Sequence, residues 1–553
     1  MRKLGIFLAY APEQSLSEHG LGRLLAMLIH GMKQREVSLV LGMPHWCERE
    51  VRKLLSDLDV DTLGVEWLTT SKDPVLLRMH KSLLAWRRRR RRTRRAGFVR
   101  SVVASVRSIV LRIGKVFEAG LATSSIVLFA MTIVAITTPP LAIVWYVARS
   151  EPAVIGAAIV IVLIGGPAIC NRRLRKALLA RLIHLRRSAA RVFRPAREFK
   201  SVTLAQRMYA QMRDQEMGRL LAKVNRRGDI EAWLIPTIFW PEAAGIKASK
   251  TVVVPDVVMI DAPVHFAEHV SLATFGDLRK SIVGADHLIC YSEHVRQAHL
   301  VRRFGIEESR ISVIEHAPVD TREPFRRPLY CSIPVAEASA HMLREFFEGG
   351  TGANQLRGVD LADVPFLFYA SQIRPHKNIL TLIKAYETLL RRDLVDAKLV
   401  LTGDLFAPEA SKLLSYVHSQ RLQYDVISLP RIPSRILSAL FARSRLAVCP
   451  TLSEGGLPFT FTEALNVDTP VIMSRIPVVV EKVTDPDLAA AMLFDPYDAG
   501  DLCARMRWAL DNRQSLLAMQ RPLFAELSKR TWNDVASDYI AVMSSARRDR
   551  ANA

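Results

Sequence analysis

Short apolar runs recur along the chain and alternate with longer segments in which apolar and polar residues follow helical spacing. This alternation of strand and helix is typical of open α/β folds with parallel sheets. We predict strands at LGIFLAY (4–10), EVSLVLG (36–42), TLGVEWL (62–68), IEAWLIP (230–236), KTVVVPD (250–256), HLICYS (287–292), RISVIEH (310–316), PFLFYAS (365–371), KLVLTGD (398–404), DVISLP (425–430), RLAVCPT (445–451), PVIMS (470–474) and AMLFDP (491–496).

The grouping of these runs predicts two open α/β domains, because a long insertion separates the third run from the fourth and a less patterned stretch separates the seventh from the eighth. The expected parts are an N-terminal domain in two pieces, 1–75 and 200–320, an insertion at 76–199, a linker at 321–364, a second domain at 365–530, and a C-terminal helix and tail at 531–553.

The insertion contains two uncharged apolar segments, 121–147 and 152–170, of 27 and 19 residues. A helix rises about 1.5 Å per residue, so roughly 20 residues suffice to cross the hydrocarbon core of a bilayer. Only four residues separate the segments, which predicts a tight hairpin of two transmembrane helices. Two buried core helices are the alternative.

Basic residues flank both outer ends of this hairpin. Residues 86–115 carry twelve Arg or Lys and no acid, and residues 172–200 carry eleven with one Glu. Together they hold +22 of the formal net charge of +23, so the rest of the chain is close to neutral. By the positive-inside rule both ends lie in the cytoplasm, which predicts a protein of the inner (cytoplasmic) membrane.

The arginine run Arg87–Arg92 has two interpretations. Basic clusters beside a membrane span attract anionic lipid headgroups at about 1 kcal/mol per residue, and the adjacent segment 99–117 suits an interfacial helix. Nucleic-acid binding is the alternative, but no recognisable nucleic-acid module accompanies the run and no aromatic residues are interleaved in it. We therefore predict contact with anionic membrane lipids rather than with nucleic acid.

The stretch TLSEGGLPFTFTEALNVDTPVIMS (451–474) concentrates candidate chemistry. It places Glu454 and Glu463 around a glycine pair and a proline, just before an apolar strand. Carboxylates accept hydrogen bonds from hydroxyl groups, and glycines let the backbone approach a ligand closely. The helix expected from Phe459 would favour an anionic group at its N-terminus. These residues predict a site for a sugar joined to a phosphate; an ordinary turn between strand and helix is the alternative.

This stretch resembles the signature of the family 4 (group 1) retaining glycosyltransferases, which have the GT-B fold of two Rossmann-like domains. The resemblance lies in Glu463-Ala464 and in the TPVI sequence at 469–472. Eight residues separate Glu454 from Glu463, whereas the family usually has seven, so Glu454 stands one position early.

The segment SQIRPHKNILTLIKAY (371–386) is similar to the phosphate-binding element of the same family. Lys377 matches the family lysine, whereas Arg374 stands three residues before it instead of the usual five. The resemblance implies that Glu454 binds the hydroxyls of the donor sugar and Glu463 those of the ribose. Lys377 and Arg374 would stabilise charge on the departing diphosphate. The other donor-side and phosphate-binding candidates are Gly20, Gly22, Gly403, Gly455, Gly456 and Leu457.

On the acceptor side the candidates are Asp256 and His265, in VVVPDVVMIDAPVHF (252–266). This segment resembles the family strand that ends in His-Asp, but Pro255 stands where the family has its histidine.

We expect no metal and no cofactor other than the nucleotide sugar as substrate. The D-x-D patterns at 57–61 and 485–487 fall in predicted turns, where Asp caps the backbone. The six cysteines lie far apart without a C-x-x-C pair, which argues against a zinc site or a disulfide framework.

The resemblance and the hairpin together predict a membrane-anchored retaining glycosyltransferase of the GT-B fold, with catalytic domains facing the cytoplasm. It would move a sugar from a nucleotide sugar to a glycan or lipid-linked acceptor of the cell envelope, as in polysaccharide biosynthesis. The alternative is a degenerate GT-B module that acts as a membrane scaffold or sugar-binding protein. The shifted Glu454, the moved Arg374 and the missing histidine motivate that alternative.

Overall fold

The computed structural model describes residues 2–82 and 204–552, apart from gaps at 13–15, 17–19, 36, 59, 75–76, 79–81, 262–271, 350–355, 357 and 431. The predicted membrane hairpin (121–147 and 152–170), its basic flanks and the expected interfacial segment 99–117 lie outside the described residues. Within the described ranges, no helix combines the length and the apolar character that crossing a bilayer requires.

The thirteen strands of the described structure lie within or overlap the predicted apolar runs. They are β1 (Arg2–Phe7), β2 (Val37–Met43), β3 (Glu66–Thr69), β4 (Ala232–Ile235), β5 (Ser249–Val254), β6 (His287–Cys290), β7 (Ile311–Val313), β8 (Phe366–Tyr369), β9 (Lys398–Leu401), β10 (Val426–Ser428), β11 (Leu446–Cys449), β12 (Val471–Ser474) and β13 (Leu493–Phe494).

Helices fill most of the intervals between these strands. They are α1 (Gly20–Lys33), α2 (His45–Asp57), α8 (Leu204–Val224), α9 (Val258–Asp261), α10 (Leu272–Val283), α11 (Val335–Glu348), α13 (Ile379–Arg391), α14 (Ser411–Ser419), α15 (Ser434–Arg443), α16 (Phe459–Asn466), α17 (Pro477–Val480), α18 (Pro486–Met492), α19 (Ala499–Asp511), α20 (Arg513–Leu527) and α21 (Trp532–Asn552).

The strands form two parallel sheets. The N-terminal sheet has the order β3-β2-β1-β4-β5-β6-β7, and the C-terminal sheet has the order β10-β9-β8-β11-β12-β13. Every residue of β4, β5, β6, β8, β11 and β12 is buried, which explains why β4, β8 and β11 are continuous apolar runs rather than alternating patterns.

Each sheet has a topological switch point, where the strand order reverses. The N-terminal sheet switches between β1 and β4, and the C-terminal sheet between β8 and β11. In open α/β folds ligands bind outside the carboxyl ends of the strands at such points. The loops that follow β8 and β11 contain the two most prominent candidate motifs of the sequence.

The stretch 321–364, expected to be a linker, instead contains the helix α11. One face of α11 is buried, and the helix packs against α15 of the C-terminal domain. Its residues Ala338, Met342 and Leu343 belong to the same hydrophobic core as the C-terminal sheet. The structure therefore corrects the sequence-based expectation here, because most of this stretch is part of the C-terminal domain.

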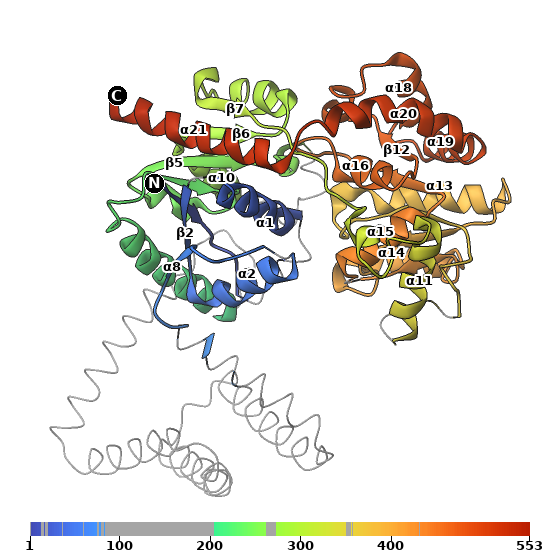
Figure 1. The fold of residues 1–553 in the computed structure, drawn as a ribbon, viewed down its shortest axis with the longest axis horizontal. Helices are drawn as coiled ribbons and strands as arrows, with labels where there is room; N and C mark the ends of the chain where they lie inside the picture. The colour runs from blue at the N-terminus through green and yellow to red at the C-terminus, as the bar shows by residue number, and fades with distance from the viewer. Residues whose placement is uncertain are drawn as a thin grey trace, which may run out of the picture. The chain divides into compact units, whose positions relative to one another are not determined.

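The chain ends in the predicted helix, α21, which returns to the N-terminal domain. It packs against α1 and β5, and it lies across the N-terminal sheet in Figure 1. Arg547 pairs with Glu231, and Arg550 donates to the backbone oxygen of Ala248 at 2.9 Å. The N-terminal domain is therefore assembled from the first, middle and last parts of the described chain.

Candidate functional site

Lys377 and Glu454 meet at the switch point of the C-terminal sheet. Lys377 ends a 3₁₀ turn (Pro375–Lys377) in the loop after β8, and Glu454 lies in the loop after β11. Since β8 and β11 are paired neighbours, their two loops emerge side by side. The Lys377 Nζ and Glu454 Oε1 atoms form an ion pair, and each side chain is 21% exposed. Asn378 adopts a left-handed conformation (φ 55°) and directly precedes α13.

The Lys377–Glu454 pair is ionised at neutral pH. Burial favours the neutral form of Glu454, but the ammonium group of Lys377 outweighs it, and the pKa of Glu454 is lowered. Burial likewise opposes the charge of Lys377, but Glu454 outweighs it, and the pKa of Lys377 is raised. Thr451 Oγ1 donates a hydrogen bond to the same Glu454 oxygen at 2.9 Å. The pair thus presents a fixed cation and a fixed anion at the sheet edge.

Arg374 lies near this pair but is exposed. Its Nε and Nη2 atoms donate to Gln372 Oε1 at 3.1 and 3.0 Å. Its charge still reaches the acceptor side, because it contributes to the electrostatic environment of Asp256.

Glu463 is held by a residue that the sequence analysis did not propose as a site residue, Arg23. Glu463 lies on α16, its side chain is only 5% exposed, and its Oε1 atom is 2.8 Å from Arg23 Nη2. The contact is an ion pair without the angles of a hydrogen bond, since Oε1 has no hydrogen-bond partner among the described residues. Arg23 lies in the first turn of α1, where the helix dipole disfavours a cation. An arginine at such an unfavourable position is the feature of the sequence that could have indicated a role for Arg23.

The glycine pair 455–456 packs against the N-terminal domain. A Cβ atom added to Gly455 would lie 1.5 Å from the backbone oxygen of Pro255, and one added to Gly456 would lie 2.9 Å from Tyr291 Cβ. Ser292 Oγ also donates to the Gly455 oxygen at 2.8 Å. In this structure the two glycines let the Glu454 loop dock onto the other domain.

Of the other glycine candidates, Gly20 and Gly22 lie at the start of a helix and Gly403 lies after a strand. Gly20 is the first residue of α1, and a Cβ on Gly22 would lie 2.1 Å from the Leu16 oxygen. A Cβ on Gly403, after β9, would lie 2.5 Å from Ile373 Cγ1. Its neighbour Asp404 accepts a hydrogen bond from the Phe406 amide at 2.9 Å and therefore stabilises a turn.

Asp256 follows β5 and lies beside the Glu454 loop. Its Cα atom is 3.2 Å from the position that a Cβ of Gly455 would take. Burial raises the pKa of Asp256, the carboxylate of Glu454 raises it further, and Lys377 and Arg374 oppose the shift. The other acceptor-side candidate, His265, lies outside the described residues.

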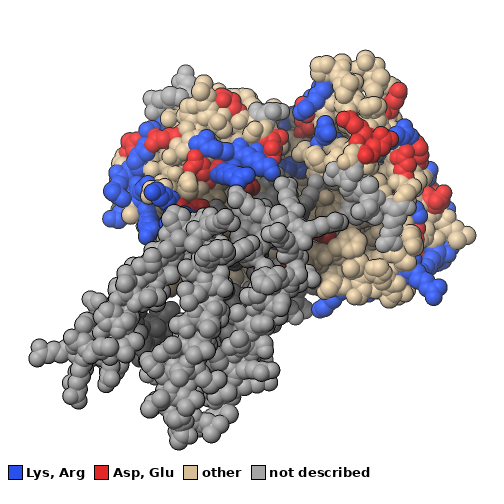
Figure 2. Space-filling model, turned by 90° about the horizontal axis from the view of Figure 1, so that it is seen from below, with Lys and Arg blue, Asp and Glu red and all other residues tan. Residues whose placement is uncertain are grey.

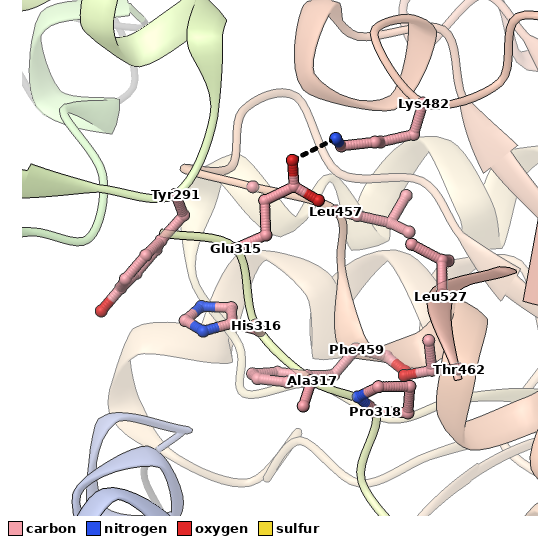
Figure 3. A pocket seen from close by; sticks show the side chains of 11 residues that line it. Tyr291, Glu315, His316, Ala317, Pro318, Leu457, Phe459, Thr462, Lys482 and Leu527 are labelled. Atoms are coloured by element: carbon pink, nitrogen blue, oxygen red, sulfur yellow. Dashed lines mark hydrogen bonds and ion pairs between the residues drawn. The ribbon is translucent and has the colours of Figure 1, made fainter. Parts of the chain in front are cut away.

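A hollow lies behind the Glu454 loop, where the chain passes between the domains (Figure 3). The ring of His316 stacks on Phe459 at 4.9 Å and contacts the ring of Tyr291 at 3.9 Å between centroids. Burial and the charge of Arg530 lower the pKa of His316 to about 3, so the imidazole is neutral. Gly456 and Leu457 line this hollow, but Glu454 and Lys377 do not. It therefore belongs to the domain junction rather than to the charged pair.

The predicted D-x-D turns behave as capping and surface residues. Asp485 caps α18 by accepting from the amides of Asp487 and Leu488, and Asp61 pairs with Lys33. In the part of the chain that the structure describes, no cluster of three or more His, Cys, Asp or Glu could hold a metal ion. The expectation of a metal-free site stays a prediction.

The charged pair lies in a part of the chain that is similar to a known sequence family. Residues 359–521 match the family model of glycosyl transferases group 1. O-antigen chain mannosyltransferase B of Escherichia coli is 28% identical over 187 residues, which are 34% of this chain and 47% of that protein. The chain thus matches about half the length of this curated relative.

Solved structures show the same fold at low sequence identity. Anabaena Alr3699/HepE, determined in complex with UDP and glucose, has a TM-score of 0.53 at 11% identity, with 99% of this chain and 100% of that chain covered. The N-terminal domain of Candida albicans trehalose-6-phosphate phosphatase has a TM-score of 0.54 at 11% identity, with 99% and 97% covered. Part of this chain is thus similar to glycosyltransferases of group 1, and the solved structures share its fold.

Proposed function

We propose that the chain is a retaining glycosyltransferase that moves a sugar from a nucleotide-sugar donor to a hydroxyl group of a glycan. The observation that carries this proposal is the ionised Lys377–Glu454 pair at the switch point of the sheet, inside the region that matches group 1. The fold neighbour HepE was solved with UDP and glucose, and the curated relative is a mannosyltransferase, which supports a nucleotide-sugar donor.

In the proposed reaction the bond between the anomeric carbon and the diphosphate oxygen breaks, and its electron pair leaves with the diphosphate. The acceptor hydroxyl oxygen bonds to the same face of that carbon, and its proton passes to the departing phosphate oxygen. Lys377, with Arg374 at the rim, stabilises the negative charge that develops on the diphosphate. Glu454 binds hydroxyls of the donor sugar, and Glu463 binds those of the ribose.

Asp256 is the acceptor-side residue of this proposal. It lies in the N-terminal domain beside the Glu454 loop. Because its pKa is raised, a larger fraction of this carboxyl group is protonated at a given pH than for an ordinary aspartate. Such a group can donate or accept a hydrogen bond with an acceptor hydroxyl. No metal takes part in the proposed reaction.

We further propose that the hairpin at 121–170 anchors the enzyme in the cytoplasmic membrane, with the described domains on the cytoplasmic side. The sequence pattern supports this, as does the position of β3 and β4 within one sheet, because an even number of crossings returns the chain to the same side. Lys and Arg also gather over the N-terminal domain on the face seen in Figure 2, which suits a surface of anionic lipid. The acceptor would then be an envelope glycan or a lipid-linked glycan.

The test is a transfer assay on the purified full chain in lipid nanodiscs, with UDP-glucose and GDP-mannose among the donors and a glycolipid extract as acceptor. We expect Lys377→Ala to lower the release of nucleoside diphosphate by at least about 100-fold, since the charge it neutralises develops in the transition state. Lys398→Ala is the matched control, because Lys398 pairs with Asp425 at the opposite end of the sheet. Absence of transfer by the wild type with every donor would contradict the proposal and would favour the scaffold alternative, which no present finding supports.

A further inference from the structure

The loop that carries Glu454 is anchored to the N-terminal domain through the residue just before it. Ser453 Oγ donates a hydrogen bond to Asp261 Oδ2 at 2.9 Å. Ser453 is buried, and Asp261 is the last residue of α9. A carboxylate acceptor makes this hydrogen bond stronger than one between neutral groups.

His299 lies behind the same carboxylate. Its Nε2 atom is 3.3 Å from Asp261 Oδ1, and its side chain is 6% exposed. Both ring nitrogens are buried without a hydrogen-bond partner among the described residues. His299 lies in a π-helical turn (Val295–Val301), a form that occurs frequently at functional sites. Among the described residues, the buried ring of His299 thus lies against the carboxylate of Asp261 and, edge to face at 5.1 Å between centroids, the ring of His294.

The charge state of His299 fits this arrangement. Burial lowers the pKa of His299, and the neighbouring His294, Arg302 and Arg303 lower it further, against the opposing pull of Asp261. The imidazole is therefore neutral at pH 7 and carries a single N–H, which it can offer to the carboxylate.

We propose that Asp261, backed by His299, is a positioning residue that fixes Ser453 and thereby holds Glu454 at the donor sugar. The proposal rests on the function proposed above and deepens it. It means that the N-terminal domain helps to complete the sugar half of the donor site through Asp261, as it supports the ribose side through the contact of Arg23 with Glu463.

The consequences follow from the position of Glu454 between two restraints. Lys377 holds its carboxylate, and the Ser453 contact with Asp261 holds its backbone. Small misplacements of a binding group cost much of its effect. Loss of the Asp261 contact should therefore weaken binding of the sugar, but not of the nucleoside diphosphate.

The experiment measures, by calorimetry on the full chain, the Kd of UDP and UDP-glucose and of GDP and GDP-mannose. The variants are Asp261→Ala, Ser453→Ala and the double variant. For whichever nucleotide and nucleotide sugar the wild type binds, we expect each single variant to raise the Kd of the nucleotide sugar about tenfold, which is the effect of losing one charge-assisted hydrogen bond. The nucleoside diphosphate should keep its Kd within about twofold. The double variant should be no weaker than either single one, because both remove the same contact.

Several further measurements keep the test decisive. Asp261→Asn retains an acceptor oxygen for Ser453 and should therefore lose less affinity for the nucleotide sugar than Asp261→Ala. Asp61→Ala removes an exposed carboxylate of the same domain, paired with Lys33, and should change neither Kd. Equal weakening of nucleotide and nucleotide sugar, or full additivity in the double variant, would overturn the positioning role. A wild type that binds none of the four ligands would instead overturn the proposed function itself, and this inference with it.

Discussion

Removing one member of the Lys377–Glu454 pair should destabilise the protein more than removing both. Lys377→Met leaves the Glu454 carboxylate in a site where it is only 21% exposed, with the Thr451 hydroxyl as its remaining donor. Breaking a buried pair costs about 3–5 kcal/mol. The partial exposure and the remaining hydrogen bond place this case at the lower end, about 3 kcal/mol. For a domain of this size that corresponds to a fall in Tm of about 6–12 °C.

The double variant Lys377→Met/Glu454→Leu should recover most of that loss, since apolar groups of similar volume replace a buried ion pair at little cost. Thermal unfolding followed by circular dichroism gives the Tm of the wild type, both single variants and the double variant. Transfer activity should be lost in all three variants, so the double variant separates stability from chemistry. The reasoning is refuted if the two single effects simply add, because the side chains would then be energetically uncoupled.

Three further predictions concern the same region. The contribution of the pair to the free energy of unfolding should be constant between about pH 5 and 10. Because the pKa of Glu454 is lowered, the stabilisation from this carboxylate is present above its ordinary pKa of 4.5 and is lost as pH falls through its pKa in the folded protein. Because the pKa of Lys377 is raised, the stabilisation from this ammonium group is present below its ordinary pKa of 10.5 and is lost as pH rises through its pKa in the folded protein. A Tm difference between wild type and the double variant that changes between pH 6 and 9 would contradict this. Gly455→Ala should lower transfer at least about tenfold while the protein stays folded, because its Cβ would overlap the Pro255 oxygen and undock the loop; unchanged kcat/KM would show that docking is dispensable. Arg23→Ala should lower the Tm by about 4–8 °C, because it leaves the buried Glu463 carboxylate without its cation, at a cost of about 2 kcal/mol in the free energy of unfolding. Arg23→Lys keeps a cation and should lower the Tm less. Identical Tm values for the two variants would rule out the charge as the cause.

Much of the fold was accessible from the sequence because parallel strands that are buried on both faces are continuous apolar runs. β8 and β11 were predicted on that ground. The helix α11 was missed, because its buried residues Ala338, Met342 and Leu343 were taken for part of an unpatterned linker.

The site was predictable in its local parts and not in its long-range ones. The family resemblance assigned Lys377 and Glu454 to one donor site, and in the structure each follows one of two neighbouring strands. The pairing of Arg23 with Glu463 and the contact of Ser453 with Asp261 join residues far apart in the sequence, and no local pattern records them. The glycine pair was recognised as a place of close backbone approach, and in this structure Pro255 approaches Gly455.

The return of α21 to the N-terminal domain has a consequence for how the protein forms on the ribosome. Domains generally fold as units in the order of their synthesis, N-terminal first. Here α1 and β5 are covered by α21, which begins at Trp532, after all the strands and helices of the second domain. The C-terminal sheet has all its strands once Phe494 has emerged, so the second domain can mature first. The first domain stays incomplete, with part of its core uncovered, until α21 leaves the exit tunnel.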